Sequence, residues 1–392
     1  MIKKVFPILA LCTFSSMIGM GVITPILPLY ADQLGATGIW IGALYGGYAF
    51  SRAVFMPFMG RLSDRKGRKL FMVLGLLLQS LTAVAYIFSH NMPQLMAVRI
   101  LHGLVSGITA PVARAWVGDI APQGEEGKWM GYFNAAFATG FATGPLLGGF
   151  LTDRYNMTVT FAFMGGLNFV AFIAATFLYE TGERKGKGPA QLSFRKMSDS
   201  GLFRGLFIYR TLYEVTMGGF MAFISIYCSV NLKMSTTLIG ILLAVSLYSF
   251  SLLQILSGRI ADRFNKRTML LAGSLVDFTM LALIPLTGNF WYLLGLIIIR
   301  SIGSATAIPA ESALSINLGR QFGMASTMAI FAIASSLGAG VGPILSGVFN
   351  DWGGIQWVFY FSGGAGFLGV ILFSWLSRSR LAKTPLTTET SK

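Results

Sequence analysis

Charged residues are scarce in this chain. They make up 11% of its 392 residues, whereas they make up about 25% of an average soluble protein. Hydrophobic residues account for 54% of the chain, and the mean hydropathy is +0.67. Such a chain cannot cover a water-facing surface with polar groups, which excludes an ordinary cytosolic enzyme.

Cysteine and histidine are also rare, with two residues of each. Cys12 and Cys228 both fall within apolar stretches. These residues supply neither a disulfide framework nor a cluster of metal ligands, so we expect no metal site. The chain also lacks a G-x-x-x-x-G-K-[ST] loop, so nothing in the sequence indicates the use of ATP.

The apolar residues occur in runs of about 20, long enough to cross a hydrocarbon layer about 30 Å thick as helices. Transmembrane strands would instead alternate over segments of about ten residues. We therefore expect an all-α membrane protein with twelve transmembrane helices. Their approximate spans are 6–30, 38–59, 70–90, 93–118, 129–152, 158–179, 203–228, 236–257, 268–288, 290–316, 322–349 and 355–376.

Basic residues outnumber acidic residues by 30 to 15. Relative to the expected helices, 23 of the 30 lie on one side, Arg154 and Lys233 lie on the other, and five lie within helices. Cytoplasmic loops of membrane proteins are enriched in Lys and Arg, so both termini are expected in the cytoplasm. The basic segments are not interleaved with stacking aromatic residues, so nucleic acid is not an expected partner.

An internal repeat divides the chain into two halves. A constant offset of 198 residues pairs Ile41-Gly42 with Ile239-Gly240, Pro111 with Pro309, and Asp153 with Asp351. The expected domains are a six-helix bundle (1–179), a polar cytoplasmic linker (180–202), a second six-helix bundle (203–378) and a cytoplasmic tail (379–392). Two parallel repeats of this kind place a cavity between the halves that opens alternately to either side, which favours a transporter.

A glycine-containing basic motif joins the second and third expected helices. It reads GRLSDRKGRK from Gly60 to Lys69, and a weaker copy begins at Gly258. This arrangement resembles the signature loop of the major facilitator superfamily, and the resemblance covers essentially the whole chain. It implies a cytoplasmic latch made of Gly60, Asp64, Arg65, Arg68, Gly258, Asp262 and Arg263, with Asp119 as an acidic partner.

The fifth expected helix carries a second motif. Gly140, Gly144, Pro145, Gly148 and Gly149 form the pattern G-x-x-x-G-P-x-x-G-G. Glycines allow helices to approach closely and proline bends a helix, so packing alone is one explanation. The pattern also resembles one found in drug–proton antiporters of the superfamily, and overall the chain is similar to the tetracycline and multidrug efflux branch. This resemblance implies proton-coupled export.

Ionisable residues within membrane helices are costly and are therefore functional candidates. The proton-coupling candidates are Glu214, Asp277, Arg99 and His102, and the substrate-cavity candidates are Arg52, Arg210, Tyr213 and Arg300. Arg210 and Glu214 are four residues apart and share a helix face.

Each coupling candidate has a structural alternative. Glu214 can instead form a permanent ion pair, Asp277 can be a packing partner for Arg300, and His102 can make a single interhelical hydrogen bond. Arg99 with Gly103 resembles a further family motif that is linked to proton movement. Glu311 and Arg114 are expected toward the cytoplasmic ends of their helices, as parts of a gate.

The function we expect is secondary active transport. More specifically, we expect proton-coupled efflux of amphipathic or drug-like small molecules by alternating access. We expect no cofactor, because the proton gradient supplies the energy. Five arginines face three acids within the helices, and Ser15 and Ser16 stand where many relatives carry an acid. A lipid, lysolipid or organic-anion carrier is therefore the alternative.

An enzyme is not expected. It would need a nucleophile with a base, or a metal, and the sequence suggests neither. We expect a monomer in the bacterial cytoplasmic (inner) membrane, with protons, the amphipathic substrate and membrane lipids as its partners.

Overall fold

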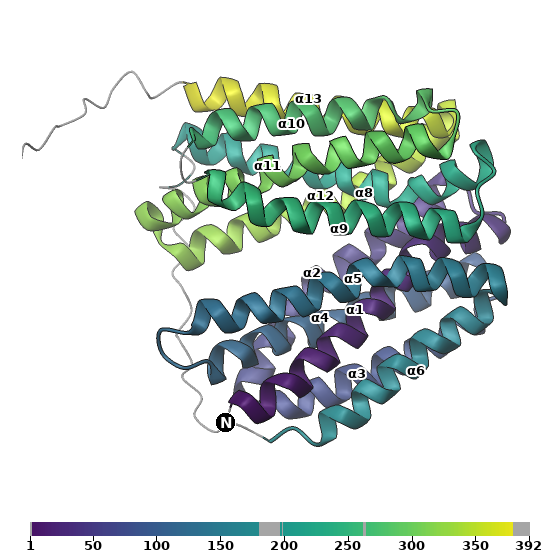
Figure 1. The fold of residues 1–392 in the computed structure, drawn as a ribbon, viewed down its shortest axis with the longest axis vertical. Helices are drawn as coiled ribbons and strands as arrows, with labels where there is room; N and C mark the ends of the chain where they lie inside the picture. Colours follow the sequence, from purple (N-terminus) through teal and green to yellow (C-terminus); the bar gives the residue numbers. More distant parts are fainter. Residues whose placement is uncertain (1, 180–196, 198, 262–263, 379–392) are drawn as a thin grey trace, which may run out of the picture.

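The computed structural model describes residues 2–179, 197, 199–261 and 264–378. Within these residues, twelve long helices form two bundles of six, which lie one above the other in Figure 1. The first bundle contains α1 (Ile2–Gln33), α2 (Gly38–Lys66), α3 (Arg68–Ile87), α4 (Met92–Ile120), α5 (Glu126–Arg154) and α6 (Met157–Thr176). The second contains α8 (Gly201–Ile226), α9 (Thr236–Ala261), α10 (Lys266–Ala282), α11 (Phe290–Phe322), α12 (Met324–Gly353) and α13 (Ile355–Arg378). The predicted all-α fold is confirmed.

Ten of these helices are long and apolar enough to cross a membrane. α10 has 17 residues, and the charged and glycine-rich sequence of α2 lowers its hydropathy. Both helices nevertheless pack within the array, α2 against α4 and α12, and α10 against α11 and α13. A membrane-spanning array of this size agrees with the scarcity of charge in the sequence.

Several helix boundaries differ from the predicted ones by a few residues, and two of these differences have a clear local cause. The second helix was expected to end at residue 59, but α2 continues through the motif to Lys66, and only Gly67, with φ +103°, separates it from α3. Glycine adopts positive φ without a steric cost, which permits this abrupt change of direction. The ninth span was expected to reach residue 288, but α10 ends at Ala282 and Pro285 lies in the 3₁₀ turn η2 (Ile284–Leu286).

The two bundles approach each other closely at one end, where α2 and α9 begin. We name this the far end, and we name the opposite end, which carries the 60–69 motif, the latch end. Asp351 at the C-terminus of α12 accepts hydrogen bonds of 2.5 and 3.0 Å from the first two backbone N–H groups of α2. Asp153 at the C-terminus of α5 accepts bonds of 3.0 and 2.6 Å from the first two N–H groups of α9.

These two carboxylate caps, Asp153 and Asp351, are 198 residues apart, as are the helix starts that they contact. The repeat in the sequence is therefore a twofold relation between the bundles. Two glycines near the caps are related by the same offset of 198 residues. Gly42 packs on the carbonyl of Pro343, and Gly240 packs on the carbonyl of Pro145. A side chain at either glycine would collide with the opposite helix, so both direct backbone packing and the carboxylate caps hold the far end closed.

Candidate functional site

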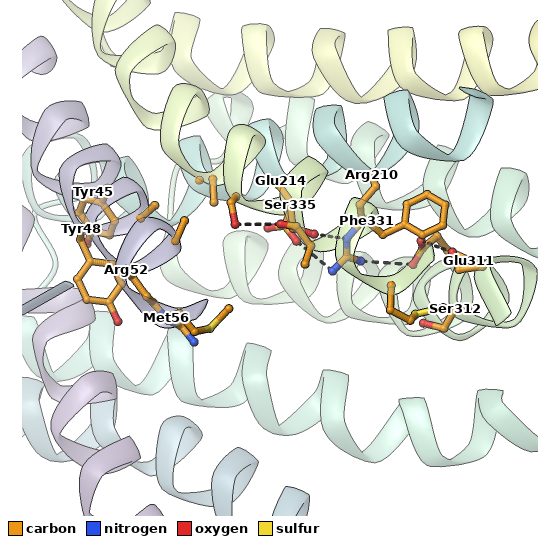
Figure 2. A pocket seen from close by; sticks show the side chains of 18 of the residues that line it. Tyr45, Tyr48, Arg52, Met56, Arg210, Glu214, Glu311, Ser312, Phe331 and Ser335 are labelled. Atoms are coloured by element: carbon orange, nitrogen blue, oxygen red, sulfur yellow. Dashed lines mark hydrogen bonds and ion pairs between the residues drawn. The ribbon is translucent and has the colours of Figure 1, made fainter. Parts of the chain in front are cut away.

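A cavity of about 820 Å³ lies between the two bundles. Its size falls in the usual range for small-molecule sites, about 300–1,000 Å³. One wall comes from α2 and α4 and the other from α8, α11 and α12 (Figure 2). The lining includes Tyr45, Tyr48, Arg52, Met56 and Arg114 on the first wall, and Arg210, Glu214, Glu311, Phe331 and Ser335 on the second.

Arg210 joins two acids on the second wall. Its Nη2 lies 3.2 Å from Oε1 of Glu214, and its Nη1 lies 3.4 Å from Oε2 of Glu311. Its Nε also donates a hydrogen bond of 2.7 Å to the hydroxyl of Ser335. Figure 2 shows the guanidinium group between the two carboxylates. One positive charge faces two carboxylates, so the uptake of a single proton would make this cluster neutral.

Glu311 lies elsewhere than the sequence indicated. We expected Glu311 and Arg114 at a gate near the helix ends, but both line the cavity, and the Glu311 side chain is only 6% exposed. The position of a residue in the sequence gives its depth along a helix, but the direction of its side chain depends on how the helix packs. Ser335 and Phe331, which also line the cavity, carry no charge signal and were not predicted.

A second ion pair lies behind the second wall. Nε of Arg300 is 2.8 Å from Oδ1 of Asp277, and the two side chains are 6% and 0% exposed. The Arg300 guanidinium also lies 4.1 Å from the centre of the Phe220 ring. Neither residue is among the described residues that line the cavity, nor is Tyr213, which packs against Phe278. The structure thus places Asp277 in the packing arrangement that the sequence left as an alternative.

Arg99 and His102 are both buried in the first bundle. The Arg99 guanidinium lies over the rings of Tyr48 and Tyr45, at 4.3 and 5.2 Å from their centres. Its Nε donates a hydrogen bond to a backbone carbonyl of α2. Nδ1 of His102 lies 3.1 Å from the hydroxyl of Tyr86 on α3. This contact is the interhelical hydrogen bond that was considered for His102.

A smaller pocket of about 180 Å³ lies within the first bundle. It shares Tyr48 and Arg52 with the cavity, and we name it the side pocket. Its polar lining includes Ser16, Gln79 and Thr109, which form a chain: Ser16 donates to Gln79 at 2.7 Å, and Gln79 donates to Thr109 at 2.6 Å. The apolar lining comprises Met17, Met20, Ala110, Phe137 and Phe141.

The internal repeat relates the side pocket to the charged residues of the second bundle. The offset of 198 residues pairs Ser16, Gln79 and His102 with Glu214, Asp277 and Arg300, respectively. At these positions the first bundle carries two neutral side chains and a histidine, whereas the second carries two acids and an arginine. At these three positions the acids and the arginine therefore belong to the second bundle.

The structure brings three of the predicted latch residues together at the latch end. Arg68 lies 2.5 Å from Asp64 and 3.0 Å from Asp119, and it also donates to the hydroxyl of Ser63 at 2.9 Å. The other predicted latch residues are Gly60 and Arg65 in the last turns of α2, Gly258 near the end of α9, and Asp262 and Arg263, which lie outside the described residues.

Replacing Asp119 by asparagine should lower the free energy of unfolding by less than about 1 kcal/mol, because solvent screens exposed ion pairs. The Asp119 side chain is 45% exposed. Thermal unfolding of the purified protein in detergent would measure this change. A loss of several degrees would contradict the expectation and show that the pair contributes more than its exposure suggests.

The glycines of the fifth-helix motif face two different partners. Gly140, Gly144 and Gly148 pack against the backbone of α1, and a side chain on any of them would collide with it. Gly149 instead packs on the start of α9 in the other bundle. The motif therefore joins α5 both to its own bundle and to the far-end contact.

The sequence of this chain matches a known protein family along most of its length. The model of the Major Facilitator Superfamily matches residues 9–226 and 206–392. The chain belongs to this superfamily. The fold, the cavity between two bundles and the family together make it a multi-pass membrane transporter.

Two curated relatives match nearly the whole length of this chain. It is 29% identical over 370 residues to an uncharacterized MFS-type transporter of Methanocaldococcus jannaschii, covering 92% of this chain and 94% of the relative. It is also 26% identical over 379 residues to the quinolone resistance protein NorA of Staphylococcus aureus, covering 94% and 95% of the two chains.

Solved structures support the same fold. A bacterial homologue of the human lysosomal transporter Spinster, in an inward-facing and unoccupied conformation, superposes with a TM-score of 0.83 at 15% identity, covering 96% of this chain and 97% of that one. The nucleoside transporter NupG superposes with a TM-score of 0.82 at 15% identity, covering 95% and 99%. At such identities the likeness concerns the fold alone.

Proposed function

We propose that this transporter exports amphipathic or drug-like small molecules in exchange for protons. The observation that carries the proposal is the cluster of Arg210, Glu214 and Glu311 on the cavity wall. Since one guanidinium faces two carboxylates, the charge state of the cluster depends on what else occupies the cavity. A substrate that displaces water or competes for Arg210 changes this balance and so can drive the release or uptake of a proton.

Two further observations support export. The fifth-helix motif resembles that of drug–proton antiporters, and the relative NorA is a quinolone resistance protein. In the proposed arrangement the transporter lies in the cytoplasmic membrane as a monomer, with both termini in the cytoplasm. The cavity then loads from the cytoplasm while the far end is closed, and it releases its substrate after the bundles have rocked.

The test is substrate-evoked proton movement in proteoliposomes that contain a pH-sensitive dye. A quinolone, a neutral amphipath and an anionic amphipath would be added to wild type and to Glu214→Gln and Glu311→Gln. We expect the proton signal to fall to background in both variants, because an amide cannot exchange a proton. Glu126→Gln is the matched control and should keep the proton signal. Glu126 is exposed at the start of α5, and its described side-chain hydrogen bond is with the nearby backbone N–H of Gly124.

Two outcomes would contradict the proposal. Undiminished proton signals in both glutamine variants would remove the cluster from the coupling mechanism. Transport of the anionic probe without any proton signal in wild type would instead favour the lipid or organic-anion carrier.

A further inference from the structure

We propose that Arg52 and Arg114 form an anion-binding subsite on the first cavity wall. The transported amphipath then carries a carboxylate or another compact anionic group beside a single ring or a short apolar chain, and this apolar part enters the side pocket. The inference rests on the proposed function, because it names the substrate class of the same cavity.

The first argument is the lack of a protein counter-ion. In the part of the chain that the structure describes, no acidic side chain pairs with Arg52 or Arg114. Arg210, by contrast, is bonded to two acids. Arg114 instead lies 5.9 and 6.0 Å from the ring centres of Phe133 and Phe137. Both arginines line the same cavity, so an anion bound there would lie beside two positive charges that no described acid pairs with.

The second argument is the placement of charge in the cavity. Three arginines and two glutamates line it, and both glutamates lie on the second wall, in contact with Arg210. The first wall therefore carries positive charge that no acidic side chain on the same wall balances. Guanidinium groups bind carboxylates through two parallel hydrogen bonds, so an anionic group fits this wall and a cationic group is repelled by it.

The third argument is the side pocket next to Arg52. Arg52 lines both the cavity and the side pocket, and Phe137 lies both beneath Arg114 and in the side-pocket wall. An apolar cavity of about 150 Å³ is known to hold benzene, so about 180 Å³ accommodates one ring. Met17 and Met20 give this pocket an adaptable surface, because methionine side chains are flexible and polarizable.

The fourth argument concerns proton coupling. The proposed anion site is on the opposite wall from the Arg210 cluster, so an anionic substrate need not displace Glu214 or Glu311 to bind. The proposed substrate site and the acidic cluster then lie on separate walls of one cavity.

The experiment compares three probes that share a phenyl ring on a four-carbon chain and differ in the polar head group and its charge: 4-phenylbutyrate, 4-phenylbutyramide and 4-phenylbutylammonium. Equilibrium dissociation constants would be measured by ligand-observed NMR on the full-length protein in detergent, without a proton gradient. We expect wild type to bind the anion most tightly. In the double variant Arg52→Gln/Arg114→Gln, the affinity for the anion should fall by about tenfold or more, because about one charge-assisted hydrogen bond is lost. The affinity for the amide should stay the same.

Two controls separate charge from folding. Arg52→Lys/Arg114→Lys keeps the positive charge and should retain a preference for the anion over the amide. Arg204→Gln, at an exposed position in the first turn of α8, should leave all three affinities unchanged.

Three outcomes would overturn the subsite: equal binding of the three probes by wild type, tighter binding of the ammonium probe, or an unchanged anion preference in the double glutamine variant. These outcomes are distinct from failure of the proposed function, which is measured by proton movement in the Glu214 and Glu311 variants. Anion preference with no proton coupling would retain the subsite and overturn the antiporter.

Discussion

Removing both carboxylate caps, in the double variant Asp153→Ala/Asp351→Ala, is expected to open the far end of the transporter. Each carboxylate satisfies two backbone N–H groups at the start of a helix in the other bundle. Loss of a helix-capping side chain costs about 0.5–2 kcal/mol, so losing both should cost the closed state about 2 kcal/mol, or about thirtyfold in population.

Spin labels at Gln33 and Leu286, which lie at the far end in different bundles, would measure the change by pulsed electron spin resonance. Leu286 is 71% exposed, and the native Cys12 and Cys228 are buried. A longer distance should appear in the double variant and be absent in Asp32→Ala, whose exposed side chain makes no described contact with the other bundle. An unchanged distance distribution would show that backbone packing alone keeps this end closed.

Replacing Arg210 by methionine should destabilise the protein strongly. The substitution leaves Glu214 and Glu311 without their shared partner, with side chains only 22% and 6% exposed. Removing one partner from a buried ion pair costs about 3–5 kcal/mol. Because the cavity admits some solvent, we expect the lower end of that range, together with a loss of transport.

The triple variant Arg210→Met/Glu214→Gln/Glu311→Gln is the matched control. It removes the unpaired charges as well as the arginine, so it should regain most of the lost stability without regaining proton coupling. Thermal unfolding in detergent would measure both proteins. If Arg210→Met alone unfolds at the wild-type temperature, the three side chains do not depend on one another for stability.

Much of the fold could be predicted because it follows from hydropathy and from the repeat. The apolar runs predicted twelve helices, and the 198-residue offset paired Asp153 with Asp351, although it did not predict the far-end contacts that these residues make. The pairing of Arg210 with Glu214 follows from helix periodicity, which places residues four apart on one face. These features depend on local sequence, so they need no knowledge of how the bundles pack.

The site was predicted less completely, because it depends on which helix faces turn toward the cavity. Arg300 and Tyr213 were predicted to line the cavity, yet the structure buries both away from it. Glu311 was placed at a gate, and only the packing of α11 against α8 brings it to Arg210. Within the first bundle, the neutral counterparts of the charged positions gave no chemical signal, so the side pocket could not be foreseen.

The far-end caps have a consequence for mutational tolerance. Both carboxylates bind main-chain N–H groups, which every residue except proline supplies, so side-chain identity at the starts of α2 and α9 contributes nothing to these bonds. Substitutions at Ile39 that keep the helix should therefore leave closure intact, whereas the Thr237 hydroxyl also donates to the carbonyl of Gly149 at 3.5 Å and both threonine side chains at the start of α9 interact with Asp153. Gly38 is a further exception, because a side chain there would collide with Gly347 and with Asp351 itself. Sequence drift in related chains should thus be wide at Ile39 and narrow at Gly38, at the two threonines and at the two aspartates.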